Sequence, residues 1–157
     1  MKKFKIKEMV KTMSHVNAID PRFMFALIET ESNWNQWAVK YEKQYMWYLH
    51  DPALDSFVCS QGTIRTMQSF SYGLCQIMGN HFYEFGYKGF CTQLLDPQLN
   101  VIVAINILKQ FIKQNIELPE ELYAAYNAGS VKRQPNGKLQ NQGNVDRFMI
   151  IYSNTKV

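Results

Sequence analysis

Hydrophobic positions along the chain recur at helical rather than strand spacing. Met24, Leu27 and Ile28 follow the i, i+3, i+4 rule that places residues on one helix face. An Asp-Pro pair just before them supplies an N-cap and a first helical residue, so we expect a helix over 21–32. Alternation of apolar and polar residues, the mark of a half-buried strand, is nearly absent. The pattern therefore predicts an all-α protein.

Two further helices carry clear start or stop signals. A second Asp-Pro pair opens the run 97–114, which is apolar nearly all round, as expected of a central buried helix. Pro119 opens another helix, and Gly129 is placed to end it in the left-handed conformation.

Weaker patterns predict the remaining helices. Asn144 can cap a last helix that runs to Tyr152. Shorter helices are expected over 6–15 and over 73–85, the second of them ended by Gly86.

The connections between these helices are of two kinds. The segment 33–71 is long and aromatic, and a long segment of this kind between helices is usually functional; a small hairpin fits within 41–70. Residues 130–143 are polar and basic, which indicates a loop. Because no linker or repeat interrupts the 157 residues, we expect a single domain over 1–157.

Composition and charge exclude several classes of protein. A hydrophobic fraction of 46% with 19% charged residues excludes a disordered chain, and no apolar run is long enough for a transmembrane helix. The net charge of +4 favours an anionic polymer such as nucleic acid or bacterial cell wall, without the dense basic stripe of a DNA binder. The basic N-terminus lacks the apolar core and cleavage site of a signal peptide, although a chain trimmed of its signal would look the same.

Cysteines and histidines give no sign of a metal site. The cysteines are odd in number and lack CxxC spacing: Cys59, Cys75 and Cys91. We expect three reduced thiols rather than a disulfide framework. The histidines do not cluster as metal ligands do: His15, His50 and His81. Neither a metal nor another cofactor is expected.

Glu31 is the carboxylate whose position points to chemistry. It extends the helix face of Met24, Leu27 and Ile28, whereas Glu29 lies about 200° around the helix and should point elsewhere. Lost hydration and the negative end of the helix dipole should both raise the pKa of Glu31. A carboxyl group that stays protonated near neutral pH can act as a general acid, whereas an ordinary helix-end glutamate would be solvated.

Three segments follow one another along the chain: ALIETESNWN (26–35), SYGLCQIM (71–78) and AAYNAGS (124–130). In this order and spacing they resemble the soluble lytic transglycosylase family, which shares its fold with goose-type lysozymes. The resemblance covers about residues 19–152 and implies one lysozyme-like helical domain. ESNWNQWAVKYE and SYGLCQIMG look closest to phage-type members, with departures at Lys40, where Arg is common, and at Cys75, where Met is common.

The resemblance also implies roles for individual residues. Glu31 would donate a proton to the glycosidic oxygen between N-acetylmuramic acid and N-acetylglucosamine. As a carboxylate it would then take the proton of the muramyl C6 hydroxyl, which closes on C1 and gives a 1,6-anhydro sugar without a carboxylate nucleophile. Ser71 and Gln76 would hydrogen-bond the acetamido and sugar groups. Tyr126 and Asn127 would hold the sugar and the acid.

Three further carboxylates leave the mechanism open. Glu42 either lies in the cleft, where it would orient Glu31 or contact substrate, or stabilises the fold by hydrogen bonds; we count it as a candidate binding residue. Asp51 and Asp55 lie in the long segment, and either could position a water molecule. A positioned water would make the protein an inverting hydrolase.

The sequence therefore predicts a peptidoglycan-cleaving glycosidase, and the phage-type resemblance implies a bacteriophage endolysin or virion-associated lysin. Such a protein would be made in the host cytoplasm, be released by a holin or carried in the virion, and act on the wall as a monomer. Neither nucleic-acid binding nor membrane insertion is expected. The alternatives are a goose-type muramidase that uses water, a noncatalytic wall-binding module, and a nucleic-acid binder suggested only by charge and aromatic content.

Overall fold

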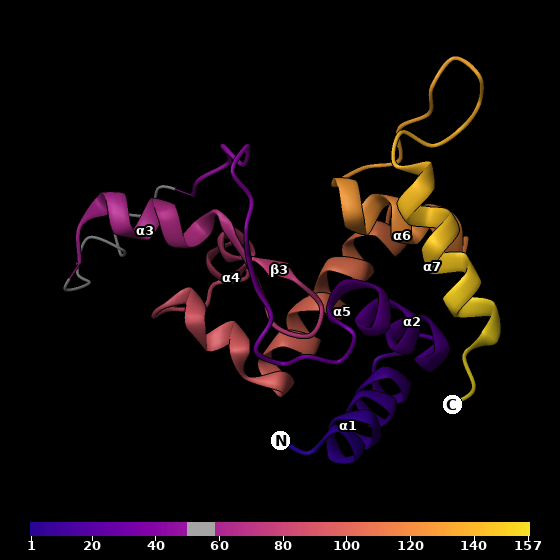
Figure 1. Cartoon of the computed structure of the whole chain (residues 1–157), viewed down its shortest axis with the longest axis horizontal. Coiled ribbons are helices and arrows are strands. Elements are labelled where there is room, and N and C mark those ends of the chain that lie inside the picture. The colour runs from indigo at the N-terminus through magenta and orange to yellow at the C-terminus, as the bar shows by residue number, and fades with distance from the viewer. Residues whose placement is uncertain (50–58) are drawn as a thin grey trace.

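The protein is mostly helical with a small antiparallel sheet, as the computed structural model describes for residues 1–49 and 59–157 (Figure 1). The α-helices are α1 (Lys3–Val16), α2 (Pro21–Ser32), α3 (Gln61–Gln68), α4 (Gly79–Glu84), α5 (Pro97–Ile112), α6 (Pro119–Ala128) and α7 (Gln142–Asn154). The other elements are β1 (Val39–Tyr41), β2 (Phe70–Tyr72), β3 (Ile77–Met78) and the 3-10 helix η2 (Cys91–Leu95). The helical prediction is confirmed.

Both Asp-Pro pairs begin a helix, as predicted. The Asp20 carboxylate accepts a hydrogen bond from the backbone N–H of Arg22 at 2.8 Å at the start of α2. Asp96 accepts one from Leu99 at 2.9 Å at the start of α5. Each bond satisfies a backbone donor that the first helical turn leaves without a partner. The predicted ends of these helices agree with the structure to within two residues.

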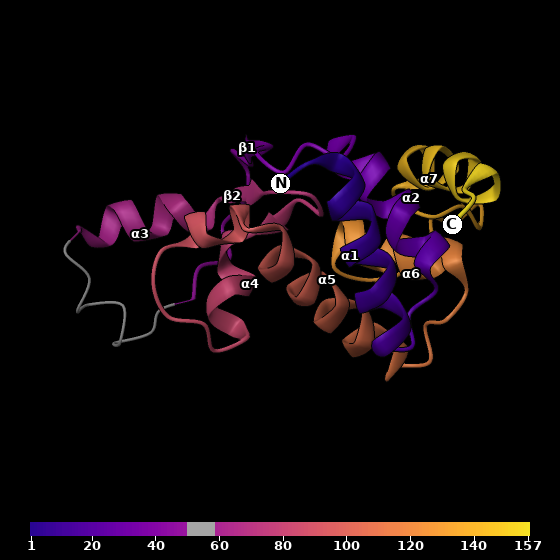
Figure 2. The ribbon, with the colours of Figure 1, turned by 90° about the horizontal axis from the view of Figure 1, so that it is seen from below.

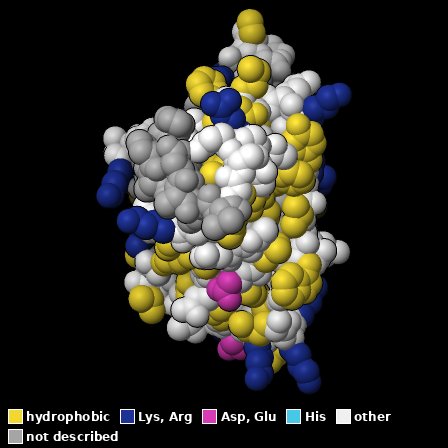
Figure 3. Space-filling model, turned by 90° about the vertical axis from the view of Figure 1, so that its left-hand side faces the viewer, with side chains coloured by type: hydrophobic (Ala, Val, Ile, Leu, Met, Phe, Trp, Pro, Cys, Tyr) yellow, Lys and Arg dark blue, Asp and Glu magenta, His cyan; other side chains and the backbone are white. Residues whose placement is uncertain are grey.

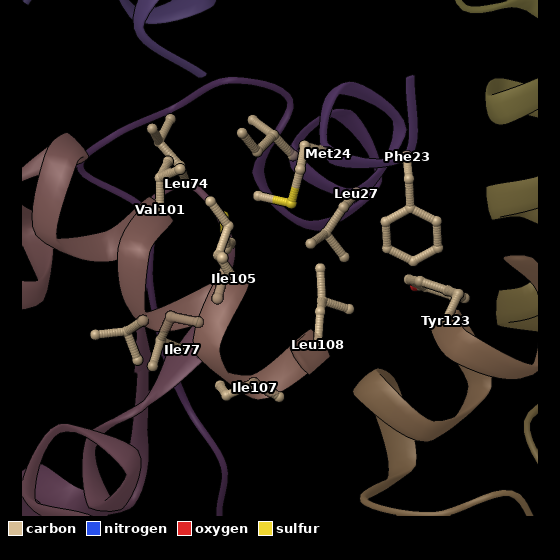
Figure 4. Packing of buried hydrophobic residues seen from close by; sticks show 14 of the residues in the cluster. Phe23, Met24, Leu27, Leu74, Ile77, Val101, Ile105, Ile107, Leu108 and Tyr123 are labelled. Carbon is tan, nitrogen blue, oxygen red and sulfur yellow. The ribbon is translucent and has the colours of Figure 1, made fainter. Parts of the chain in front are cut away.

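Helix α5 forms the centre of the core. Ile105 and Leu108 on this helix are fully buried and lie against Met24 and Leu27 of α2 (Figure 4). The same helix contacts α1, α6 and β3, so it joins the helical part of the molecule to the sheet (Figure 2). Its nearly continuous apolar sequence, which predicted a central position, is explained by this packing on several sides.

The predicted helix over 73–85 is wrong in its first half. Residues 70–78 form the hairpin β2–β3 instead, with Ser71 opposite Met78, and only α4 is helical. Gly73 turns the chain at a φ of +72°, where a Cβ would lie 2.5 Å from Nδ2 of Asn100. This close approach requires glycine and ends any helix there. Gly86 follows α4 with a φ of +78°, consistent with its predicted role.

The aromatic segment 33–71 contains more regular structure than predicted. Strand β1 pairs antiparallel with β2, placing Lys40 opposite Ser71. Among the described residues of this part of the chain, the hairpin lies at 70–78, after the predicted segment 41–70, and no sequence pattern indicated α3.

The prediction for the last helix needs one correction. Helix α7 begins at Gln142 after Asn141, so Asn144 lies in its first turn and is not its cap. The side chain of Asn144 instead donates a hydrogen bond to Asn127 at 3.1 Å. Gly129 ends α6 with a φ of +76°, as predicted.

A buried asparagine fixes the hairpin to the central helix. The Asn100 amide nitrogen donates to the carbonyl oxygens of Tyr72 and Leu94, both at 2.8 Å. Its side-chain oxygen accepts a hydrogen bond from the backbone of Cys75 at 2.8 Å. These bonds use both amide hydrogens and the side-chain oxygen of the buried Asn100, as expected of a buried polar group. They hold residues 72–75 in place.

The cysteines and the helix lengths were also predicted from the sequence. Cys59, Cys75 and Cys91 are free thiols, as expected. Within the described ranges, no helix has the length and apolar character that a membrane crossing requires.

Candidate active site

Glu31 lies in the last turn of α2 and is half-buried. Burial is the main cause that raises its pKa above the usual value, and the charge of Glu42 adds to the rise. The hydroxyl of Tyr123 and the charges of Arg147 and Lys40 act in the opposite direction. The predicted elevation of the Glu31 pKa is therefore supported, with desolvation as its physical cause. Glu29 is exposed, in agreement with the helix geometry.

The residues after Glu31 anchor the end of its helix. The Ser32 hydroxyl donates a hydrogen bond to the carbonyl oxygen of Leu74 at 2.7 Å and lies 3.1 Å from the carbonyl oxygen of Ile28, the alternative acceptor. Asn33 ends α2 in the left-handed conformation, which asparagine tolerates better than most residues. Ser32 thus attaches the helix that carries Glu31 to the β2–β3 turn.

Tyr123 is the direct partner of the Glu31 carboxylate. Its hydroxyl donates a hydrogen bond to Oε1 of Glu31 at 2.9 Å. The Tyr123 side chain is only 1% exposed, and its ring stacks on Phe148 with a centroid distance of 4.2 Å. The sequence motifs did not single out Tyr123, although it lies three positions before Tyr126 and therefore on the same side of α6.

Charged side chains surround the pair formed by Glu31 and Tyr123. Arg147 of α7 is exposed, and its guanidinium lowers the pKa of the Tyr123 hydroxyl by charge and hydrogen bonding, although burial raises that pKa more strongly. Lys40 forms an ion pair with Glu42 at 2.8 Å, and both charges act on Glu31. No sequence pattern indicated Arg147, because its proximity to Glu31 and Tyr123 depends on how α7 packs.

Ser71 and Gln76 bond to each other inside the hairpin. The Ser71 hydroxyl donates to the side-chain oxygen of Gln76 at 2.8 Å. The amide nitrogen of Gln76 donates to the carbonyl oxygens of Gly73 at 3.0 Å and Ala38 at 3.3 Å. Ser71 is buried and Gln76 is half-buried. Their assignment as sugar-binding residues stays a prediction.

Tyr126 and Asn127 occupy different environments at the end of α6. The Tyr126 hydroxyl donates to the carbonyl oxygen of Cys75 at 2.7 Å, and burial raises its pKa strongly, with a smaller contribution from the charge of Glu31. Tyr126 therefore lies near the acid without bonding to it. Asn127 is exposed, and its side-chain oxygen accepts from Asn141 at 2.9 Å as well as from Asn144.

The structure brings several of the predicted residues together from distant parts of the sequence. Glu31, Glu42 and Tyr126 converge with Tyr123, whereas Asp51, Asp55 and His50 lie outside the described residues. No group of three or more potential metal ligands occurs in the part of the chain that the structure describes. A half-buried carboxyl group with a raised pKa and one fixed hydrogen-bond donor is suited to proton transfer.

Comparisons with known proteins agree with this arrangement. The family model of the Transglycosylase SLT domain matches residues 8–148, which include Glu31, the β2–β3 hairpin and α6. No match was found among curated proteins.

Proposed function

Because the chain belongs to the transglycosylase SLT domain family, a family of lytic transglycosylases that act on peptidoglycan, we propose a specific reaction and acid for it. The protein cuts the β-1,4 bond between N-acetylmuramic acid and N-acetylglucosamine and leaves 1,6-anhydromuramyl ends. Glu31 serves first as the general acid and then as the general base. The observation that carries this proposal is the half-buried Glu31 carboxyl, whose pKa is raised by burial and which is held by Tyr123.

The first step requires a protonated Glu31. Desolvation disfavours the charged carboxylate and so keeps a proton available at a higher pH than for a solvated glutamate. Glu31 donates that proton to the glycosidic oxygen as the bond from this oxygen to the muramyl C1 breaks. The leaving N-acetylglucosamine then carries the proton on its 4-hydroxyl group.

The second step uses the carboxylate that the first step leaves. Glu31 takes the proton of the muramyl C6 hydroxyl, and the oxygen of that hydroxyl forms the new bond to C1. No water is consumed, and Glu31 returns to its protonated state. The nucleophile belongs to the same sugar, so its effective concentration is high. Tyr123 favours the charged carboxylate in this step because it donates a hydrogen bond to Oε1.

The polar groups of the hairpin and of α6 are proposed to bind the sugar. Ser71 and Gln76 form one hydrogen-bonded pair near the turn whose Leu74 and Cys75 carbonyls bind Ser32 and Tyr126. The acetamido group of a bound sugar can take the place of one partner in the Ser71–Gln76 hydrogen bond, so that the Ser71 hydroxyl keeps an acceptor. Asn127 and Glu42 complete the proposed binding set.

Hydrolysis by an inverting mechanism is the competing reaction. It requires a base about 6.5–9.5 Å from the acid to activate water. Glu42 is the candidate within the described residues whose charge acts on Glu31, and its carboxylate is ion-paired with Lys40. The internal C6 hydroxyl needs no such base, because Glu31 itself takes the proton.

Mass spectrometry of digested peptidoglycan tests the proposed product. Anhydromuramyl fragments are one water lighter than hydrolysis products and are not reduced by borohydride. Reducible fragments that are heavier by one water would overturn the transglycosylase proposal and place the reaction with the muramidases. Glu31→Gln protein, digested in parallel, should release neither product.

We further propose that the protein is a bacteriophage endolysin or virion-associated lysin. The support is the similarity of residues 31–42 and 71–79 to phage-type members of the family. Expression in a bacterial host with and without a holin tests the first role: lysis that depends on the holin is expected, and no lysis in either case would contradict it. Antibody detection in purified virions tests the second role.

A further inference from the structure

The first eleven residues of the chain carry as much net positive charge as the whole chain. Residues 1–11 contain one acidic side chain, Glu8, and five lysines: Lys2, Lys3, Lys5, Lys7 and Lys11. The net charge of these eleven residues equals the net charge of +4 of the whole chain, because the other 146 residues hold 12 basic and 12 acidic side chains. The start of α1 is therefore a dense cluster of positive charge, whereas the acidic and basic side chains of the other 146 residues balance as a whole.

The helix dipole does not explain the three lysines at the start of α1. They occupy the N-cap and the first turn of α1, where the helix dipole is positive and like charge is unfavourable. The first turn has no acidic residue, and the N-cap Lys2 supplies no side-chain hydrogen bond. A partner with negative charge would remove this repulsion.

The start of α1 is also exposed and held in place. Lys2, Lys3 and Lys5 are exposed and form no ion pair with any described residue, and the Lys3 ammonium lies 6.0 Å from the centroid of the Trp34 ring. Phe4, among them, is 73% exposed. The N-terminal ammonium donates a hydrogen bond to Gln36 at 2.7 Å, which fixes this turn beside the segment that follows α2. Figure 3 shows Lys and Arg side chains at the lower end of the molecule, where Figure 1 places the N-terminus.

We propose that residues 2–5 dock the protein on a lipid bilayer that contains anionic phospholipids. The three ammonium groups contact lipid phosphates, and the Phe4 ring enters the boundary between headgroups and acyl chains. A bilayer surface accommodates both kinds of group at once, whereas a hydrated wall polymer offers carboxylates or phosphates but no acyl region for the ring. Docking of this kind is peripheral and reversible.

Vesicle co-sedimentation tests the proposal with three proteins of defined charge. The full chain should bind vesicles of phosphatidylcholine mixed with phosphatidylglycerol, bind them less as salt increases, and not bind phosphatidylcholine alone. The variant Lys2→Gln/Lys3→Gln/Lys5→Gln should lose affinity on the order of a hundredfold. The control Lys132→Gln/Lys138→Gln/Lys156→Gln, which removes three exposed lysines and has the same net charge, should bind like the wild type.

Further measurements separate docking from its alternatives. Phe4→Ser should weaken vesicle binding without a change in charge, and the lysine variant should melt no lower than the wild type because repulsion is removed. Equal loss of binding in both lysine variants would show a net-charge effect and overturn the proposal. Binding to lipid-free peptidoglycan or to DNA, without binding to anionic vesicles, would overturn it as well. Wall cleavage by the same variants reports separately on the Glu31 site.

Discussion

The Tyr123 hydroxyl donates a hydrogen bond to Oε1 of Glu31 at 2.9 Å and so joins α6 to the last turn of α2. This bond favours the charged carboxylate, whereas burial of Glu31 favours the neutral acid, and burial is the stronger influence on its pKa. Glu31 can therefore hold a proton until it donates it. After donation, the Tyr123 hydrogen bond orients and stabilises the carboxylate. A general acid that next acts as a base needs both properties.

Replacement of Glu31 by glutamine should abolish wall cleavage while the protein stays folded. Glutamine keeps the shape and can accept the Tyr123 hydrogen bond, but it cannot donate an acidic proton. General acid–base catalysis contributes roughly 10²–10⁴-fold, so a loss of this size is expected in the turbidity decrease of purified walls. Glu29→Gln is the matched control, because Glu29 is an exposed carboxylate on the same helix. Residual Glu31→Gln activity above about a tenth of wild type would contradict the assignment.

Replacement of Tyr123 by phenylalanine should change the pH profile as well as the rate. The ring and its stacking on Phe148 remain, but the bond that favours the Glu31 carboxylate is lost. The Glu31 pKa should therefore rise, and the alkaline limb of kcat/KM should move up by about one pH unit. The maximal rate should fall because the carboxyl group is less well oriented.

The control for this experiment is Tyr152→Phe. The Tyr152 ring also stacks on Phe148, with a centroid distance of 5.9 Å, and its hydroxyl donates to Asp20 rather than to Glu31. Its removal should leave the alkaline limb unchanged. A purely structural role of Tyr123 would lower the melting temperature and the rate without moving the limb. Loss of activity in Glu31→Gln together with an unshifted limb in Tyr123→Phe would reject the role of Tyr123 alone.

Local signals in the sequence predicted the helix starts but not the hairpin. Asp20 and Asp96 bond to backbone groups two or three residues away, so the signal and its partner lie in the same short segment. Strands β2 and β3 are too short to show alternation. The turn between them depends on Gly73 meeting Asn100, a contact between residues far apart in the sequence.

The candidate site shows the same division between local and distant information. Glu31 could be predicted because its helix face and its family-like segment are both contiguous in the sequence. Tyr123 and Arg147 could not, because their approach to Glu31 depends on the packing of α6 and α7 against α2. Tyr126 was found by its motif, yet its hydroxyl is directed at Cys75.

Asn100→Ala should destabilise the hairpin that carries Ser71 and Gln76. The change removes three hydrogen bonds of a fully buried side chain and leaves backbone groups of Tyr72, Leu94 and Cys75 without these partners. We expect a loss of about 3 kcal/mol or more in the free energy of unfolding, measured by urea denaturation. Asn106→Ala, on the same helix and half-buried, is the control and should cost much less. Equal costs would show that the hydrogen bonds do not decide the stability.

The stability of Glu31→Gln relative to wild type should depend on pH. The folded state raises the pKa of Glu31, so folding favours the protonated form, and this contribution to stability is present below the unfolded pKa. It is lost as pH rises through the folded pKa, where an ionised carboxylate must be held half-buried. Glutamine is never ionised, so Glu31→Gln should melt higher than wild type near pH 7 and about equally near pH 4. Glu29→Gln should show no comparable gain, and a Glu31→Gln melting temperature at or below wild type near pH 7 would show that the carboxylate is not desolvated in solution.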